Sequence, residues 1–128
     1  MKQPPFPTKE DLIKGWIHLQ RSTLNSQAYE ESFWSCMLFM NLCEDFPEDT
    51  LNVIKAILKT NDSMEIIGPL AAGPLEDLIA KHGSILIDDI EREARACPKF
   101  NKALGGVWKS NTDEAVWKRI ENVRKNIW

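Results

Sequence analysis

Glu76, Asp77 and His82 are the residue types that general acid–base catalysis uses, and they lie within the short segment GPLAAGPLEDLIAKHG, residues 68–83. Such groups act together only where their side chains reach the same point. His82 follows Glu76 by six residues and Asp77 by five, so on a regular helix the three side chains point to different sides. The sequence therefore predicts no catalytic residue. The alternative is a small enzyme or ligand-binding protein that uses all three with a group from another helix.

Metal and cofactor sites have no matching pattern in this chain. Helical metal sites pair a histidine with a carboxylate three or four residues away, and neither His18 nor His82 has one. Cys36, Cys43 and Cys97 lack C-x-x-C spacing, and the first two lie on the most apolar segment, where burial suppresses thiol reactivity. No glycine-rich phosphate loop occurs. We predict no metal ion and no cofactor.

Charge is divided unevenly along the chain. Residues 41–93 contain twelve acidic and four basic residues, whereas residues 94–128 contain three acidic and eight basic ones. Such a division either steers a protein toward a partner of opposite charge or lets the two parts of one fold attract each other. For a protein of pI about 5.4, the basic segment does not predict a nucleic acid partner. The residues predicted to contact a protein partner are Glu76, Asp77, Asp88, Asp89, Glu91, Glu93 and, as an apolar anchor, Trp108.

The composition is typical of a folded domain, since 43% of the residues are hydrophobic and 27% are charged. We predict one domain over residues 8–128, preceded by a flexible N-terminal segment, residues 1–7. No signal peptide is recognisable, and the longest apolar stretch, residues 33–43, is about half as long as a membrane span requires. The odd number of cysteines indicates free thiols. These features predict a cytoplasmic protein without a membrane partner.

Apolar residues recur with helical spacing along most of the chain, and no segment alternates like a half-buried strand. We therefore predict an all-α fold. The apolar residues 33–43 predict that the helix over residues 27–45 is the central one, surrounded by the others. The expected helix starts are Thr8 with Asp11 in a capping box, Ser26, Pro47, Asp62 or Ser63, Pro74, Ser84, Pro98 and Thr112.

Two Gly-Pro pairs are predicted to interrupt the helical path. Proline lacks a backbone donor and disfavours helical conformation in the residue before it, so Gly68-Pro69 should end one helix and Gly73-Pro74 begin the next. In that next helix, we expect Glu76 to reach back to the Gly73 amide, Asp77 to pair with Lys81, and Gly83 to close the helix. The result is a compact stack of seven or eight short helices, arranged as α-hairpins, an irregular bundle or a short α-solenoid.

Four motifs between residues 71 and 108 resemble an uncharacterised bacterial family, catalogued as a domain of unknown function. They are AAGPLEDL at residues 71–78, HG at 82–83, PKF at 98–100 and LGGVW at 104–108. The resemblance implies a bacterial cytosolic helical domain. It supplies no activity and no catalytic residue that could be transferred to this chain.

Together these features favour a non-enzymatic protein-binding module. Its most specific form is a bacterial cytoplasmic immunity protein that neutralises a toxin, because an acidic surface can occlude the basic cleft of a nuclease toxin domain. A further alternative is a helical adaptor or regulator, which could be a homo-oligomer.

Overall fold

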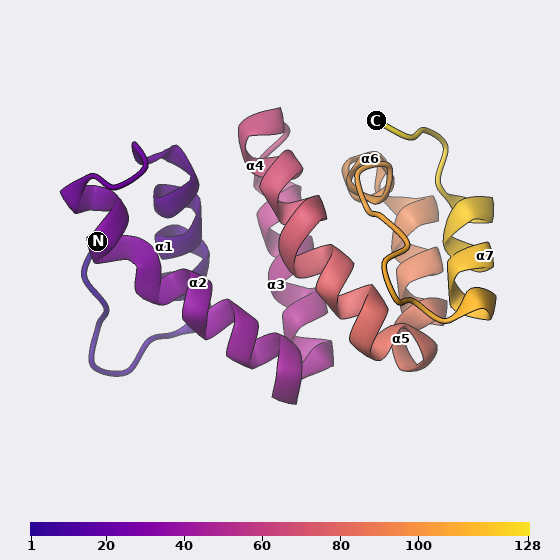
Figure 1. Cartoon of the computed structure of the whole chain (residues 1–128), viewed down its shortest axis with the longest axis horizontal. Coiled ribbons are helices and arrows are strands. Elements are labelled where there is room, and N and C mark those ends of the chain that lie inside the picture. Colours follow the sequence, from indigo (N-terminus) through magenta and orange to yellow (C-terminus); the bar gives the residue numbers. More distant parts are fainter.

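The computed structural model describes residues 1–128 and contains helices but no strands, which confirms the predicted all-α class (Figure 1). Because α4, η1 and α5 follow one another without a break, the chain forms six continuous helical segments rather than the predicted seven or eight. The elements are α1 (Lys9–Arg21), α2 (Gln27–Asp45), α3 (Pro47–Thr60), α4 (Met64–Leu70), the π-helical turn η1 (Ala71–Leu75), α5 (Glu76–Ala96), α6 (Pro98–Leu104) and α7 (Glu114–Val123).

Successive helices lie side by side along the longest axis of the molecule. Figure 1 shows α1 and α2 at one end, α3 and α4 in the middle, and α6 and α7 at the other end. α5 is the central helix, since it contacts α2, α3, α6, α7 and η1. The prediction that α2 is surrounded by other helices is wrong, because α2 packs mainly on α1 and α3 and leaves one face uncovered. The arrangement is a short stack of helices in sequence order.

Local signals set most helix starts. The Thr8 side chain accepts from the Asp11 amide at 3.1 Å, and the Asp11 carboxylate accepts from the Thr8 amide at 2.9 Å, as the predicted capping box requires. Ser26 caps α2 as expected. The predicted cap of the last helix is wrong by one residue: the carboxylate of Asp113, not the hydroxyl of Thr112, accepts from the first free amides of α7.

The two Gly-Pro pairs do not interrupt the helical path, which corrects the sequence prediction. Pro69 lies inside α4 and Pro74 lies inside η1. Part of the restriction that proline imposes on the preceding residue is a clash with that residue's Cβ, which glycine lacks. At the second pair the turn is also widened, because the Glu76 amide donates to the carbonyl of Ala71, five residues earlier. The glycines and the π-turn thus let both prolines remain within one helix.

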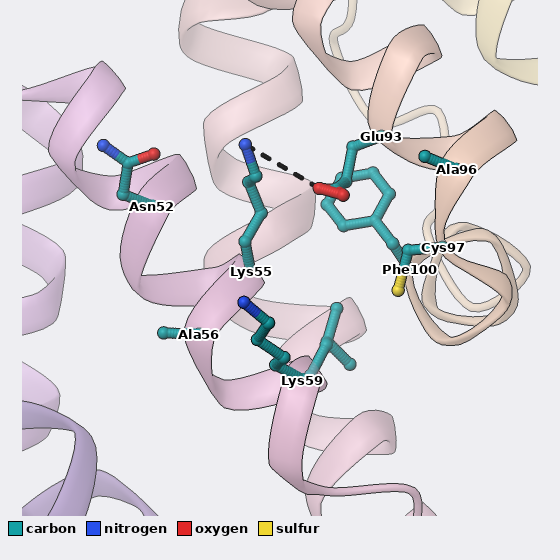
Figure 2. A pocket seen from close by; sticks show the side chains of 9 residues that line it. Asn52, Lys55, Ala56, Lys59, Glu93, Ala96, Cys97 and Phe100 are labelled. Atoms are coloured by element: carbon teal, nitrogen blue, oxygen red, sulfur yellow. Dashed lines mark ion pairs between the residues drawn. The ribbon is translucent and has the colours of Figure 1, made fainter.

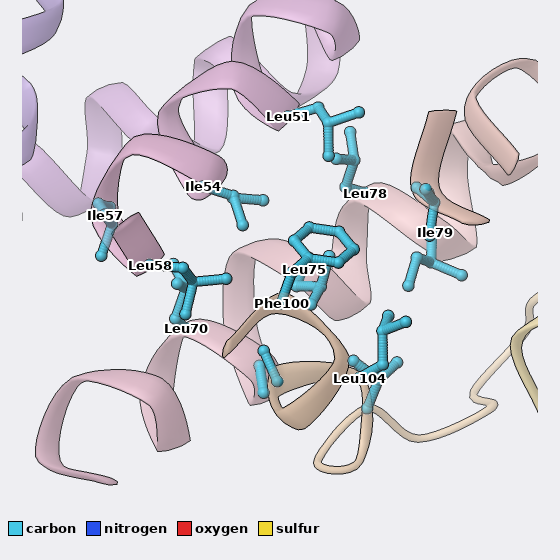
Figure 3. Packing of buried hydrophobic residues seen from close by; sticks show 14 of the residues in the cluster. Leu51, Ile54, Ile57, Leu58, Leu70, Leu75, Leu78, Ile79, Phe100 and Leu104 are labelled. Carbon is cyan, nitrogen blue, oxygen red and sulfur yellow. The ribbon is translucent and has the colours of Figure 1, made fainter. Parts of the chain in front are cut away.

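The main core joins the middle and the C-terminal part of the stack. Phe100 of α6 is fully buried, and Figure 3 shows its ring in the middle of the cluster, between side chains of α3 and α5. The labelled residues around it are Leu51, Ile54, Ile57 and Leu58 of α3, Leu70 of α4, Leu75 of η1, Leu78 and Ile79 of α5, and Leu104 of α6. This cluster fixes α3 and α6 against the continuous α4–η1–α5 segment.

The indole of Trp128 packs against the end of α6 and the two glycines that follow it. The Trp128 amide donates to the Gly105 carbonyl at 2.9 Å, and its ring N–H donates to the Lys102 carbonyl at 2.7 Å. A Cβ at Gly105 or Gly106 would collide with the Trp128 ring, so both glycines are required by this close approach. The two glycines therefore follow the end of α6 and form the surface on which Trp128 rests.

Gly83 allows α5 and α7 to pack closely instead of closing a helix as predicted, because α5 continues through it to Ala96. A Cβ at this position would lie 2.7 Å from Cγ1 of Val116, a buried β-branched side chain with little rotamer freedom in α7. We expect Gly83→Ala to lower the free energy of unfolding by about 1–2 kcal/mol, because overpacking exceeds the roughly 1 kcal/mol gain in helix propensity.

Urea denaturation measures this effect. The matched control is Gly83→Ala combined with Val116→Ala, compared with Val116→Ala alone. In that background the obstructing methyl group is absent, so the same glycine replacement should stabilise the protein. A stabilising Gly83→Ala substitution in the wild-type chain would contradict the packing argument.

Candidate functional site

Glu76 has a structural role at the start of α5. One of its carboxylate oxygens accepts from the Trp108 amide at 2.8 Å, and the other accepts from the Ser110 hydroxyl at 3.3 Å. These bonds replace the predicted contact with the Gly73 amide, since no side chain caps η1. Glu76 thus holds the segment after α6 against the first turn of α5.

Asp77 and His82 have surroundings different from those of Glu76. Asp77 lies on the side of α5 that faces α2, where it lines a small hollow of about 140 Å³ with Met40 and Cys43. Partial burial there raises the pKa of the Asp77 carboxyl. His82 is half-buried, and its Nε2 has no hydrogen-bond partner. The structure therefore does not gather Glu76, Asp77 and His82 around one point.

Arg119 of α7 binds two of the carboxylates predicted to contact a partner. Its Nε lies 3.1 Å from Glu91 Oε2, and its Nη2 contacts both Glu91 and, at 2.6 Å, Asp88. The hydrogen bonds from Arg119 hold the pKa of the Glu91 carboxyl below its usual value. The acidic and basic parts of the chain therefore attract each other here, as the alternative reading of the charge division expected.

Asp89 and Glu93 of α5 also form ion pairs within the chain. Asp89 lies 2.8 Å from Arg92 on the same helix, and Glu93 lies 3.7 Å from Lys55 of α3. Lys81, the expected partner of Asp77, instead contacts Glu44 of α2 at 2.6 Å. Of the carboxylates predicted to bind a partner, Glu76 and Asp77 form no ion pair, and Asp77 also forms no side-chain hydrogen bond.

Trp108 is the only aromatic residue among those predicted to contact a partner. Its side chain is 75% exposed, and its neighbour Lys109 pairs with Glu114 at the start of α7. The backbone of Trp108 contacts Glu76, but its ring remains available to solvent. Trp108 therefore has the exposure that an interface anchor needs.

An exposed apolar stripe on α2 was missed by the sequence prediction. Phe33, Met37 and Met40 recur at helical spacing and are 37%, 52% and 54% exposed. α2 buries only a narrow face formed by Ser32, Ser35, Phe39 and Cys43. The signal was present in the sequence, because residues 33–43 are more apolar than one buried face needs.

This stripe continues onto α5 and the start of α3. Lys81 of α5 is joined to Glu44 at the end of α2. The next residues along the chain, Asp45 and Phe46, line a shallow hollow together with Ile85 of α5. Phe46 and Ile85 are 58% and 68% exposed. We call this surface the α2–α5 face and define it by Met37, Met40, Phe46 and Ile85, with Asp45, Glu48 and Asp77 around them.

The carboxylates of the α2–α5 face make its charge negative. Asp45, Glu48 and Asp77 form no ion pair within the chain, whereas Lys81 of α5 is already neutralised by Glu44. The face thus combines exposed apolar side chains with unpaired negative charge. A surface of this kind is complementary to a partner with apolar side chains and basic residues beside them.

The structure contains no group of three or more histidine, cysteine, aspartate or glutamate side chains that could hold a metal ion. No helix has both the length and the apolar character that crossing a membrane would require.

Comparison with known proteins identifies a family without an assigned activity. No curated protein and no solved structure matches the chain. A family model described as "Family of unknown function (DUF6869)" matches residues 22–127, which include α2 to α7 and every residue of the α2–α5 face. The chain therefore belongs to this family of unknown function, DUF6869.

Proposed function

We propose that the protein is a non-enzymatic binding module that recognises another protein through the α2–α5 face. The observation behind this proposal is the exposed set Met37, Met40, Phe46 and Ile85. Exposed apolar side chains that are grouped on one surface mark binding sites more often than scattered ones do. Methionine is well suited to such a surface, because its flexible side chain adapts to the shape of a partner.

The charge of the face specifies the chemistry of the partner. Unpaired carboxylates at Asp45, Glu48 and Asp77 surround the apolar side chains, so a complementary partner has lysine or arginine around an apolar centre. A basic toxin domain has this chemistry. The most specific form of the proposal is therefore a bacterial cytoplasmic immunity protein that binds and neutralises such a toxin.

Paired substitutions test the proposal. The wild-type chain is used to capture its partner from the native host, and the affinity of the purified partner is then measured by calorimetry. We expect Met37→Glu with Met40→Glu to weaken binding at least tenfold, because both side chains lose apolar contact at the centre of the interface. Stability should change by only about 0.5 kcal/mol, since both side chains are exposed.

The matched control is Leu24→Glu with Ile127→Glu, which introduces the same two negative charges at exposed apolar residues outside the α2–α5 face. This variant should bind as tightly as wild type. The wild-type affinity should also fall as salt concentration rises, because the partner is basic. Unchanged binding by the α2 variant, or an acidic partner, would refute the role of the α2–α5 face. A basic partner that does not inhibit growth when expressed alone would refute the toxin form only.

A further inference from the structure

A separate cleft lies between α3 and the end of α5 with α6. Its volume is about 450 Å³, which falls within the range of about 300–1,000 Å³ for small-molecule sites. Figure 2 shows Lys55 and Lys59 on the α3 side, and Glu93, Cys97 and Phe100 on the other. Leu58 and Phe100 are fully buried at its base. We call this the α3–α6 cleft.

The α3–α6 cleft is positively charged although the protein as a whole is acidic. Lys55 lies 3.7 Å from Glu93, which is a loose ion pair, and Lys59 forms no ion pair. A third lysine, Lys99 of α6, directs its Nζ to the Lys59 carbonyl at 3.3 Å and also has no acidic partner. Glu93 is therefore the only carboxylate that lines the cleft, whereas Lys55 and Lys59 line it and Lys99 reaches the backbone of Lys59.

An apolar lining with more ammonium groups than carboxylates selects a particular class of ligand. The apolar part of the lining, which consists of Ala56, Leu58, Ala96, Cys97 and Phe100, can hold a hydrocarbon or aromatic group. Lys55 and Lys59 can then bind an anionic group on the same molecule through charge-assisted hydrogen bonds. We propose that the α3–α6 cleft binds a small organic carboxylate that has an apolar body. This site is independent of the α2–α5 face, and the two proposals can fail separately.

Cys97 provides a chemical reporter inside the cleft. Its side chain is half-buried and lines the cleft. The other two thiols are less suited to reaction, because burial raises the pKa of Cys36 and raises the pKa of Cys43 to about 11. In a Cys36→Ser/Cys43→Ala variant, Cys97 is the only thiol. Its reaction rate then measures which reagents enter the cleft.

The test compares two aromatic disulfides that differ in charge. 5,5′-Dithiobis(2-nitrobenzoate) is an aromatic carboxylate, and 4,4′-dithiodipyridine is its neutral counterpart. With either reagent the Cys97 thiolate attacks one sulfur, forms a mixed disulfide, and releases the other half as a thiol or thiolate. The measured quantity is the reaction rate with the anionic reagent divided by the rate with the neutral reagent. We expect Lys55→Gln with Lys59→Gln to lower this ratio about tenfold, because the cations that concentrate the anion near Cys97 are lost.

The control variant is Lys102→Gln with Lys118→Gln, which removes the same charge from two exposed lysines that do not line the cleft. It should leave the ratio unchanged. Phenylacetate should protect Cys97 from both reagents in a saturable manner, whereas acetate at equal ionic strength should not. Equal protection by acetate or inorganic phosphate would overturn the requirement for an apolar body. A ratio that is the same in the Lys55/Lys59 variant and in the control would overturn the proposal.

Discussion

Replacing Phe100 with alanine should lower the free energy of unfolding by about 3–5 kcal/mol, the largest effect we expect from a single substitution. The ring is fully buried and contacts a cluster that includes side chains of α3 and α5 (Figure 3). Alanine would leave a cavity at the point where three helices meet, and the continuous α4–η1–α5 segment cannot readily move to fill it. The same change would remove the base of the α3–α6 cleft.

Chemical denaturation measures the loss, with Phe6→Ala as the matched control. Phe6 is almost fully exposed, so the same change of residue type should alter stability by only about 0.5 kcal/mol. A Phe100→Ala protein that loses less than about 1 kcal/mol would show that the core can collapse around the missing ring.

Among the polar residues, Asn101 should be the one whose substitution destabilises the fold most. It is buried, and its side-chain amide donates to the Ala94 carbonyl at 3.2 Å and to the Val123 carbonyl at 3.0 Å. Its side-chain oxygen accepts from the Lys125 amide at 2.9 Å. One residue of α6 thus connects the last turn of α5 to the end of α7. Asn101→Ala should lower the free energy of unfolding by about 2–4 kcal/mol, because it removes these hydrogen bonds and leaves backbone groups without partners.

The control for this prediction is Asn111→Ala, since Asn111 is exposed and its side chain forms no hydrogen bond. Thermal unfolding followed by circular dichroism compares the two variants. Amide exchange should also become faster at Lys125 in the Asn101 variant, because that amide loses its acceptor. Unchanged exchange at Lys125 together with near-native stability would show that water replaces the asparagine.

Predictions that depended on neighbouring residues in the chain were the most successful. The capping box at Thr8 and Asp11 needs only a spacing of three residues, and the structure contains it. The start of α3 at Pro47 likewise follows from the missing proline donor. The all-α class followed from helical spacing that is repeated through the chain.

The Gly-Pro pairs show where a local rule failed. The rule assigns a boundary before proline because of its effect on the preceding residue, and that effect is weakened when the residue is glycine. The widened η1 turn around Pro74 has no signature in the sequence other than this pair. The role of Gly83 was also predicted wrongly. The glycine is needed because Val116, a residue 33 positions later in the chain, packs closely against it.

The candidate sites were less predictable than the fold, because charge pairing joins distant segments. Glu91 was chosen as a residue free to bind a partner, yet Arg119, 28 residues away, occupies it. Conversely, α2 was expected to be buried because of its apolar composition. Its place near one end of the stack determines that Met37 and Met40 are exposed, and composition alone does not contain that information.

The sequence-ordered stack has a consequence for how the chain reaches this structure. Most helices pack against a neighbour in the sequence, so most contacts join segments that are close together in the chain. Topologies of this kind fold rapidly, typically in microseconds to milliseconds. Among the contacts that join distant residues, those of Asn101 and Arg119 hold the last helix against α6 and α5.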